Sequence, residues 1–225
     1  MKYTHQIIRS EDGSNTLFVP ELNETYHSTH GAVQEAKHVF FKMGMDILLA
    51  EGRSSISVLE IGFGTGLNAI LAYQFTKEHN LKLNYQTVEA YPVELNLARQ
   101  LNYFEFIDAK YQSVFDQMHS SDWNVETQID ESFIFQKYHT KLEDVKNLST
   151  KVDVVFFDAF APNRQAEMWS LEQLAIVKEQ MCDKGMLVTY CANGQFKRNL
   201  KALGFEVKGV PGPPGKREMT QAFLL

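Results

Sequence analysis

The sequence predicts an α/β fold built on a doubly wound parallel sheet, with an antiparallel hairpin at one edge. Strand-like and helical stretches alternate along most of the 225 residues, which is typical of parallel strands joined by helical crossovers. The run Val-Asp-Val-Val-Phe-Phe at residues 152–157 has the continuous hydrophobicity of a strand covered on both faces. Strand patterns at residues 205–210 and 218–225 flank a Pro/Gly-rich turn, and this close spacing predicts the hairpin.

Hydrophobic spacing assigns the other elements in chain order. Apolar residues recur every three to four positions, which predicts helices, at residues 32–51, 67–79, 92–101, 142–148, 171–181 and 194–203. Short β-type runs predict strands at residues 16–20, 57–61, 81–88, 132–136 and 185–190. Gly52 and Gly204 directly follow two of the helices, at the position where glycine commonly ends one. Residues 103–130 have several aromatic side chains and no clean period.

Length and composition limit the class of protein. With 44% hydrophobic and 22% charged residues, we expect one globular domain: an N-terminal extension, residues 1–55, packed on a Rossmann-like core, residues 56–225. No apolar run approaches the ~20 residues that span a bilayer, and the start lacks the layout of a secretory signal. Cys182 and Cys191 are the two cysteines, too few for a disulfide framework or a four-thiolate zinc site. We therefore expect a cytoplasmic protein that contacts no membrane.

The charge is unevenly distributed along the chain. The net charge of −6 argues against a nucleic-acid partner, because phosphate binding relies on lysine and arginine. Residues 184–217, however, hold seven basic residues and one acid, whereas the rest of the chain carries −12. Such asymmetry produces either a local positive face or an ordinary solvated helix and loop. The charge pattern thus permits a nucleic-acid partner without requiring one.

A glycine-rich loop follows the strand at residues 57–61. It reads Glu60-Ile-Gly-Phe-Gly-Thr-Gly66 and lies where open α/β sheets bind their ligands. The loop does not match the dinucleotide-binding fingerprint, because Leu67 occupies the position of its third glycine. It does not match a phosphate-binding loop either, because no Gly-Lys-Ser/Thr follows. An alternative interpretation is a glycine-rich turn with no ligand.

The pattern Glu-x-Gly-x-Gly-x-Gly resembles the first motif of class I S-adenosylmethionine-dependent methyltransferases. The resemblance implies that Gly62, Gly64 and Gly66 pass under the methionine portion of the cofactor and that Glu60 helps to order the loop. Glu89, at the end of the next predicted strand, is placed to accept hydrogen bonds from both ribose hydroxyls.

A second candidate site follows the most apolar strand. Asp158 emerges from that strand in the run Phe-Phe-Asp-Ala-Phe-Ala-Pro at residues 156–162. An acid at the end of a buried strand is costly unless it is paired or used. Asp158 is therefore either a functional carboxylate or a group that caps the next loop or pairs with the basic C-terminal segment.

Several blocks together resemble the methyltransferase domain of the MnmC family of tRNA wobble-uridine enzymes. They are Glu-Thr-Tyr-His-Ser at 24–28 with Gly31 and Glu35, Val-Phe-Phe at 39–41, residues 60–68, residues 157–162 with Met168 and Trp169, and Gly-Lys-Arg-Glu-Met at 215–219. The resemblance implies N-methylation of 5-aminomethyl(-2-thio)uridine at the wobble position of tRNA, with Asp158 binding the amine and taking its proton. The resemblance is to the stand-alone form of these enzymes, which lacks the flavin domain. It therefore implies that the protein uses no FAD and that a separate enzyme supplies the aminomethyl group.

The resemblance also suggests residues that contact the substrate and the cofactor. Tyr26, His27 and Phe160 are candidate neighbours of the flipped-out base, since such bases commonly stack on aromatic side chains; packing on the sheet is the alternative for Tyr26 and His27. Lys216 and Arg217 are candidates for anticodon phosphates or the pocket rim. His139 stands on the adenine side, where the family usually has Gly-Asp. No histidine spacing indicates a metal site.

Three other functions stay open at this stage. One is a methyltransferase of the same type that acts on another amine, which the net acidity mildly favours. Another is a catalytically idle scaffold of the same fold, which the altered adenine-side motif supports and the presence of Glu60, Glu89 and Asp158 opposes. An NAD-dependent oxidoreductase is the least favoured, given the failed glycine spacing.

Overall fold

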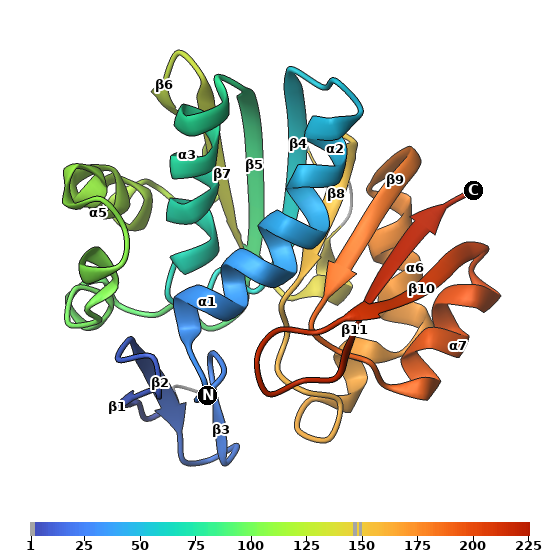
Figure 1. Ribbon diagram of the computed structural model, residues 1–225, viewed down its shortest axis with the longest axis horizontal. Coiled ribbons are helices and arrows are strands. Elements are labelled where there is room, and N and C mark those ends of the chain that lie inside the picture. The colour runs from blue at the N-terminus through green and yellow to red at the C-terminus, as the bar shows by residue number, and fades with distance from the viewer. Residues whose placement is uncertain (1–2, 146–147, 149) are drawn as a thin grey trace.

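The computed structural model describes residues 3–145, 148 and 150–225, and an eight-stranded sheet lies at its centre, in the order β10-β11-β9-β8-β4-β5-β7-β6 (Figure 1). In that order the strands are Phe205–Pro211, Glu218–Leu224, Met181–Thr189, Val152–Phe157, Ser55–Ile61, Lys82–Glu89, Phe133–His139 and Thr127–Asp130. Strands β9, β8, β4, β5 and β7 are parallel, and β11 pairs antiparallel with both β9 and β10. The predicted parallel sheet and edge hairpin are confirmed.

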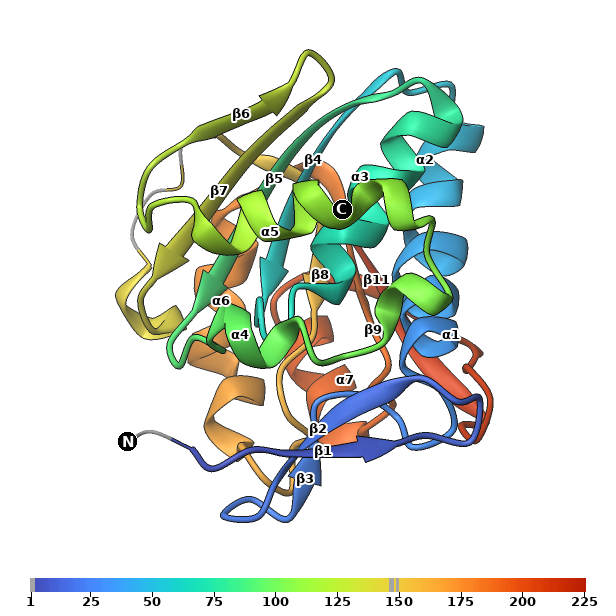
Figure 2. The ribbon, with the colours of Figure 1, turned by 90° about the vertical axis from the view of Figure 1, so that its left-hand side faces the viewer.

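Helices cover both faces of this sheet (Figures 1 and 2). The helical elements are α1 Ala32–Ala36, η1 Lys37–Met45, α2 Asp46–Ala50, α3 Leu67–His79, α4 Leu95–Ala98, η2 Tyr103–Glu105, η3 Ala109–Tyr111, α5 Gln112–Ser120, η4 Leu142–Asp144, η5 Ala166–Trp169, α6 Leu171–Glu179 and α7 Gly194–Ala202. Side chains of η1, α3 and α5 pack in one core cluster, and those of α6 and α7 pack in the other.

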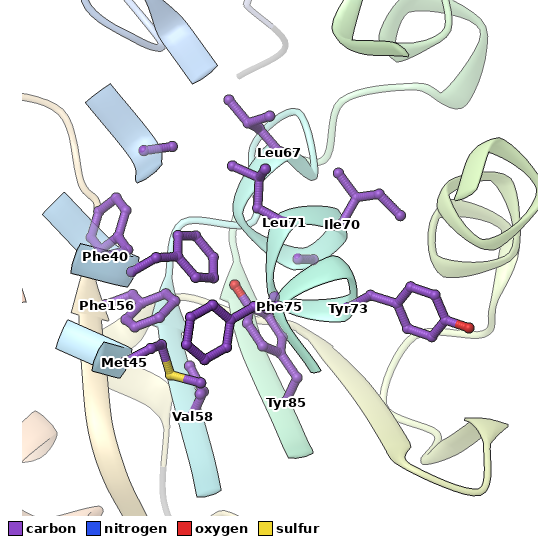
Figure 3. Close-up of a cluster of buried hydrophobic side chains, with 14 of the residues drawn as sticks. Phe40, Met45, Val58, Leu67, Ile70, Leu71, Tyr73, Phe75, Tyr85 and Phe156 are labelled. Carbon is purple, nitrogen blue, oxygen red and sulfur yellow. The ribbon is translucent and has the colours of Figure 1, made fainter. Parts of the chain in front are cut away.

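Alternation along β8 explains why the last four residues of this strand, 154–157, are all apolar. Val154 and Phe156 belong to the first cluster, whereas Val155 and Phe157 belong to the second. Successive side chains of a strand point to opposite faces, so a strand covered on both sides needs apolar residues at every position. Figure 3 shows Phe156 meeting Phe40 of η1, whose ring centroid lies 4.9 Å away.

The long helix predicted at residues 32–51 is continuous, but its middle segment η1 is π-helical. Gly44 lies in this segment, and a Cβ there would come within 3.3 Å of Val188 in β9. The absence of a side chain thus lets the helix approach the sheet closely.

Two predicted helices differ from the structure. Residues 92–101 contain only the single turn α4, because the chain is still extended at Glu94, with ψ of 137°. Of the helix predicted at residues 142–148, the structure has the short turn η4; residues 146 and 147 lie outside the described residues.

An N-terminal three-stranded sheet lies at the end of the main sheet where β5 finishes (Figure 2). Its strands are β1 Gln6–Arg9, β2 Asn15–Val19 and β3 Glu24–Thr25. Only β2 was predicted. Leu17 joins the main core cluster, and the Asn15 amide donates to Asn102 Oδ1 at 2.7 Å. Among the described residues, no helix has both the length and the apolarity required to cross a membrane.

Candidate active site

A cavity of about 590 Å³ opens at the carboxyl ends of the parallel strands. Strand β4 pairs with β5 on one side and with β8 on the other, so the loop after β4 lies at the topological switch point, where such sheets bind ligands. The cavity is lined by parts of the N-terminal segment, the glycine loop, the ends of β5 and β8, and the turn of the C-terminal hairpin.

The glycine loop adopts a backbone that other residues rarely take. Gly62 has φ of +97°, and a Cβ there would lie 2.8 Å from the carbonyl oxygen of Asp158. Gly66 has φ of +78°, and a Cβ there would lie 2.6 Å from His119 Nε2. The same His119 nitrogen donates to the Thr65 carbonyl at 3.1 Å. The loop therefore runs between the Asp158 segment and α5 with no room for side chains at these two glycines.

Two glutamates lie near this loop. Glu89 lines the cavity, and its Oε2 and Oε1 accept the backbone N–H groups of Gly64 at 2.9 Å and Tyr91 at 2.7 Å. Burial raises the pKa of Glu89. Glu60 is fully buried and lies outside the cavity lining, with Oε2 accepting the Thr87 hydroxyl at 2.7 Å. Burial raises the pKa of Glu60 well above its usual range.

Asp158 lines the cavity directly beside the glycine loop. Its backbone N–H donates to the Ile61 carbonyl at 3.1 Å, and its Oδ2 accepts Asn68 Nδ2 at 2.9 Å. Burial, reinforced by the charge of Glu35, raises the pKa of Asp158 from 3.8 to about 7. Because Asn68 fixes one oxygen, the other remains available toward the cavity.

The segment after Asp158 is held by two aromatic side chains. Trp169 Nε1 donates to the Phe160 carbonyl, and the Tyr190 hydroxyl donates to the Ala159 carbonyl, both at 2.8 Å. Trp169 is buried.

Lys216 reaches the cavity from the hairpin turn. Its Nζ donates to Glu35 Oε1 at 2.7 Å and lies 3.8 Å from the centroid of the Tyr190 ring. Glu35 Oε2 accepts the Ser28 amide at 2.7 Å. Besides Asp158, the cavity thus contains the Glu35–Lys216 ion pair, whose ammonium lies over the Tyr190 ring.

The three candidate neighbours of the base, Tyr26, His27 and Phe160, all line the cavity. The Tyr26 and Phe160 rings lie edge to face with centroids 5.1 Å apart, and a Cβ on Gly64 would come within 3.0 Å of Tyr26. His27 Nδ1 lies 3.1 Å from the Thr16 hydroxyl, and burial lowers the pKa of His27 to about 4. His27 is therefore uncharged near neutral pH.

Four predicted site residues lie outside the cavity lining: Glu60, Gly66, His139 and Arg217. His139 ends β7 with its ring 5.4 Å from that of Trp123, while Thr140 and Lys141 line the cavity instead. Arg217 is exposed beside Lys216 and also lies outside the lining.

Acidic side chains partly neutralise the basic region at residues 184–217. Lys197 pairs with Glu218 at 2.5 Å and Lys208 pairs with Glu206 at 3.1 Å. Within the described part of the chain, no group of three or more His, Cys, Asp or Glu residues could hold a metal ion.

Comparison with known proteins identifies the family. The family described as S-adenosyl-L-methionine-dependent methyltransferase matches residues 102–224, more than half of the chain and the part that contains Asp158. The chain belongs to this family. The fold of this methyltransferase accords with that assignment: an amino pentose methyltransferase, CalS10 from Micromonospora echinaspora, solved with S-adenosylmethionine bound, is 13% identical, with a TM-score of 0.52 over 87% of this chain and 92% of that chain.

More similar proteins carry the name MnmC. The crystal structure of MNMC2 from Aquifex aeolicus matches 98% of this methyltransferase and 70% of that chain, with a TM-score of 0.79 and 26% identity. The bifunctional tRNA 5-methylaminomethyl-2-thiouridine biosynthesis protein MnmC of Cupriavidus metallidurans is 31% identical over 96% of this chain, and that of Burkholderia multivorans is 25% identical over 93%. The chain spans about a third of the length of these two relatives, 33% in each case. The predicted resemblance to MnmC methyltransferases is confirmed.

The cavity of this methyltransferase fits S-adenosylmethionine. Its volume falls within the range of about 300–1,000 Å³ that is typical of small-molecule sites. Gly62 and Gly64 line the cavity, and Glu89 presents a carboxylate to it from the next strand.

Four residues of the site were not assigned roles from the sequence: Glu35, Asn68, Tyr190 and His119. Asn68 had a local signal, because it follows the glycine loop by two residues. Glu35 and Tyr190 were not predictable from spacing, since their partner Lys216 is remote in sequence. His119 lies in the stretch without a clean hydrophobic period, so its contact with the glycine loop had no signal.

Proposed function

We propose that this protein transfers a methyl group from S-adenosylmethionine to the primary amine of 5-aminomethyl(-2-thio)uridine at the wobble position of tRNA. The observation that carries the proposal is the position of Asp158, a cavity carboxylate with one oxygen fixed by Asn68, between the glycine loop and an aromatic wall. Relatives named for 5-methylaminomethyl-2-thiouridine biosynthesis support the choice of acceptor.

In this proposal Gly62, Gly64 and Gly66 hold the methionine portion of the cofactor, and Glu89 accepts hydrogen bonds from the ribose hydroxyls. Glu89 also accepts the Gly64 amide, so the same carboxylate fixes the loop and faces the ribose. Glu60, which is buried in the core, helps to order the glycine loop. His139 is placed by the structure against Trp123, and we propose Thr140 and Lys141 as closer neighbours of the adenine side. Bound S-adenosylmethionine supplies an electrophilic methyl group on its sulfonium.

Asp158 prepares the acceptor amine for attack. A primary alkylamine is largely protonated near neutral pH, and nitrogen attacks only with a free lone pair. The Asp158 carboxylate accepts a hydrogen bond from the ammonium, aligns it and takes one proton; the nitrogen pair then forms the N–C bond as the C–S bond breaks. A pKa of about 7 suits a base that works near neutrality, and such help typically contributes about 10²–10⁴ in rate.

The acceptor side is formed by Tyr26, His27, Phe160 and Lys216. Aromatic rings commonly stack on bases that leave a single-stranded loop, and Tyr26 and Phe160 offer such surfaces. Neutral His27 offers a hydrogen bond without competing for the ammonium. Arg217 is exposed outside the cavity and is suited to bind an anticodon phosphate. Such a contact positions the tRNA without recognising its sequence.

This proposal includes the organisation of the chain and its context. Residues 1–55 form an extension that brings Tyr26, His27 and Glu35 to a Rossmann-like core, residues 56–225. Transfer from a sulfonium to an amine is redox-neutral, so the step itself requires no flavin. The protein would act in the cytoplasm on tRNA, after an enzyme that installs the aminomethyl group.

The test is transfer of label from methyl-labelled S-adenosylmethionine into tRNA from cells that accumulate 5-aminomethyl-2-thiouridine. Label should enter this tRNA but not tRNA that lacks the aminomethyl group, and Asp158→Asn should lower the rate by about 10²–10⁴. Asp46→Asn, at an exposed position in α2, is the matched control and should label normally. Label in small amines but not in tRNA would overturn the choice of acceptor.

A further inference from the structure

Glu35 joins two separate walls of the acceptor side. One of its oxygens accepts the Ser28 amide and the other accepts Lys216 Nζ, each at 2.7 Å. Ser28 belongs to the N-terminal segment and Lys216 to the hairpin turn, and both line the cavity. Glu35 and Lys216 are separated by 181 positions in the chain, so this pair connects the two ends of the sequence at the site.

The pair is built into the protein and is not a loose surface contact. The side chain of Glu35 is 11% exposed and that of Lys216 is 34% exposed. The Lys216 ammonium also lies over the Tyr190 ring at 3.8 Å, a cation–π contact that holds it in place. Tyr190 in turn donates to the Ala159 carbonyl, directly after Asp158.

The charges of this cluster determine where a cationic substrate can bind. Among the described residues, six carboxylates line the cavity: Glu24, Glu35, Glu89, Glu143, Asp158 and Glu167. Glu24 lies 3.7 Å from Arg164 Nε, and Glu143 lies 3.2 Å from Lys141 Nζ. Glu89 is engaged by backbone amides of the glycine loop, and Glu35 is neutralised by Lys216. An unpaired Glu35 would attract an ammonium away from Asp158, and the two carboxylates would then compete for it.

We propose that Glu35 and Lys216 are positioning residues of the acceptor side: their pairing neutralises Glu35 and joins the two walls, so that Glu35 does not compete with Asp158 for the substrate ammonium. This inference rests on the proposed function for the identity of the cation. Neither residue needs to contact the reacting atoms.

Removing either charge should change the proton affinity of Asp158 in opposite directions. The Glu35 charge raises the pKa of Asp158 and the Lys216 charge lowers it. The other titratable groups that interact with Asp158 are Glu60 in β4, Tyr85 in β5, Tyr103 and Tyr190, and none of these carries positive charge. Lys216→Met should therefore raise the pKa of Asp158 and Glu35→Gln should lower it, each by on the order of one pH unit.

A carbon-13 NMR titration of the Asp158 carboxyl in the free protein tests this without any acceptor. The midpoint should rise in Lys216→Met, fall in Glu35→Gln and return toward the wild-type value in the double variant. Lys208→Met is the matched control, because Lys208 also combines an ion pair, with Glu206, and a cation–π contact, with Phe223, outside the cavity. Equal midpoints in Lys216→Met and Lys208→Met would overturn the electrostatic role.

Kinetics test the positioning role separately. Lys216→Met should raise the KM for acceptor tRNA by about tenfold, the effect of 1.4 kcal/mol, and leave the affinity for S-adenosylmethionine unchanged. A loss of cofactor affinity equal to the loss of acceptor affinity would contradict a role confined to the acceptor side. A wild-type protein that methylates no tRNA would refute the proposed function, whereas the NMR titration would still decide the coupling of the pair to Asp158.

Discussion

Replacing Gly62 with alanine should weaken S-adenosylmethionine binding, whereas the same replacement at Gly52 should not. Both glycines have positive φ, +97° and +81°, so an alanine at either position incurs the left-handed penalty of roughly 1–2 kcal/mol. The surroundings differ. A Cβ at Gly52 would meet nothing within 4 Å, whereas one at Gly62 would lie 2.8 Å from the Asp158 carbonyl oxygen.

The difference between the two variants isolates the crowding at the site. A methyl group forced into a packed position typically costs about 1–3 kcal/mol. If the glycine loop relieves this by moving away from Asp158, cofactor affinity should fall by about 5- to 150-fold relative to Gly52→Ala. Calorimetric titration with S-adenosylmethionine measures this directly, with thermal melts to show that both variants fold. If the two variants bind S-adenosylmethionine with equal affinity, close contact between the glycine loop and the Asp158 segment is not required for binding, and the reasoning is refuted.

Four further results are expected. The rate of methyl transfer at subsaturating acceptor should rise with pH through about 7, because Asp158 must be ionised; a profile that is flat from pH 6 to 8 would exclude Asp158 as the base. Since its folded-state pKa of about 7 lies above 3.8, ionisation of Asp158 opposes folding as pH rises between these values, so Asp158→Asn should melt above wild type at pH 8 and the gap should close at pH 4. Glu89→Gln should raise the Kd for S-adenosylmethionine by about tenfold or more, measured by calorimetry with Glu126→Gln, at an exposed position outside the cavity, as the control. His119→Phe removes the donor to the Thr65 carbonyl and should destabilise the fold by about 1–3 kcal/mol in a denaturant melt; an unchanged melt would show that this hydrogen bond does not hold the loop.

The sequence predicted those features that depend on local patterns. The mostly apolar run of β8 and the glycines after β4 each occupy a short stretch, and the parallel direction of the strands follows from the alternation of strands and helices. These features were sufficient to place Asp158 and Glu89 at the same edge of the sheet. Strands β1 and β3 were missed because they are short and carry little hydrophobic alternation: three of the four β1 residues are exposed.

Features that depend on long-range contacts were not predicted. Glu35 is buried although its partner Lys216 is remote in sequence, so hydrophobic spacing gives no sign of the ion pair. His139 was assigned to the adenine side from its place at a strand end, but the direction of its side chain depends on the register of β7 and on packing against Trp123. Lys216 was expected at phosphates or at the rim of the pocket; the fold instead pairs it with Glu35 inside the cavity.

The central claim is tested most directly by mass spectrometry of the wobble nucleoside. Acceptor tRNA that contains 5-aminomethyl-2-thiouridine is incubated with S-adenosylmethionine and either the wild-type protein or Asp158→Asn, then digested to nucleosides. The wild-type protein should convert this nucleoside to one heavier by a single methylene, with the methyl on the side-chain nitrogen, and the variant should leave it largely unchanged. An unmodified wobble nucleoside after incubation with wild-type protein that binds S-adenosylmethionine would contradict the proposed function.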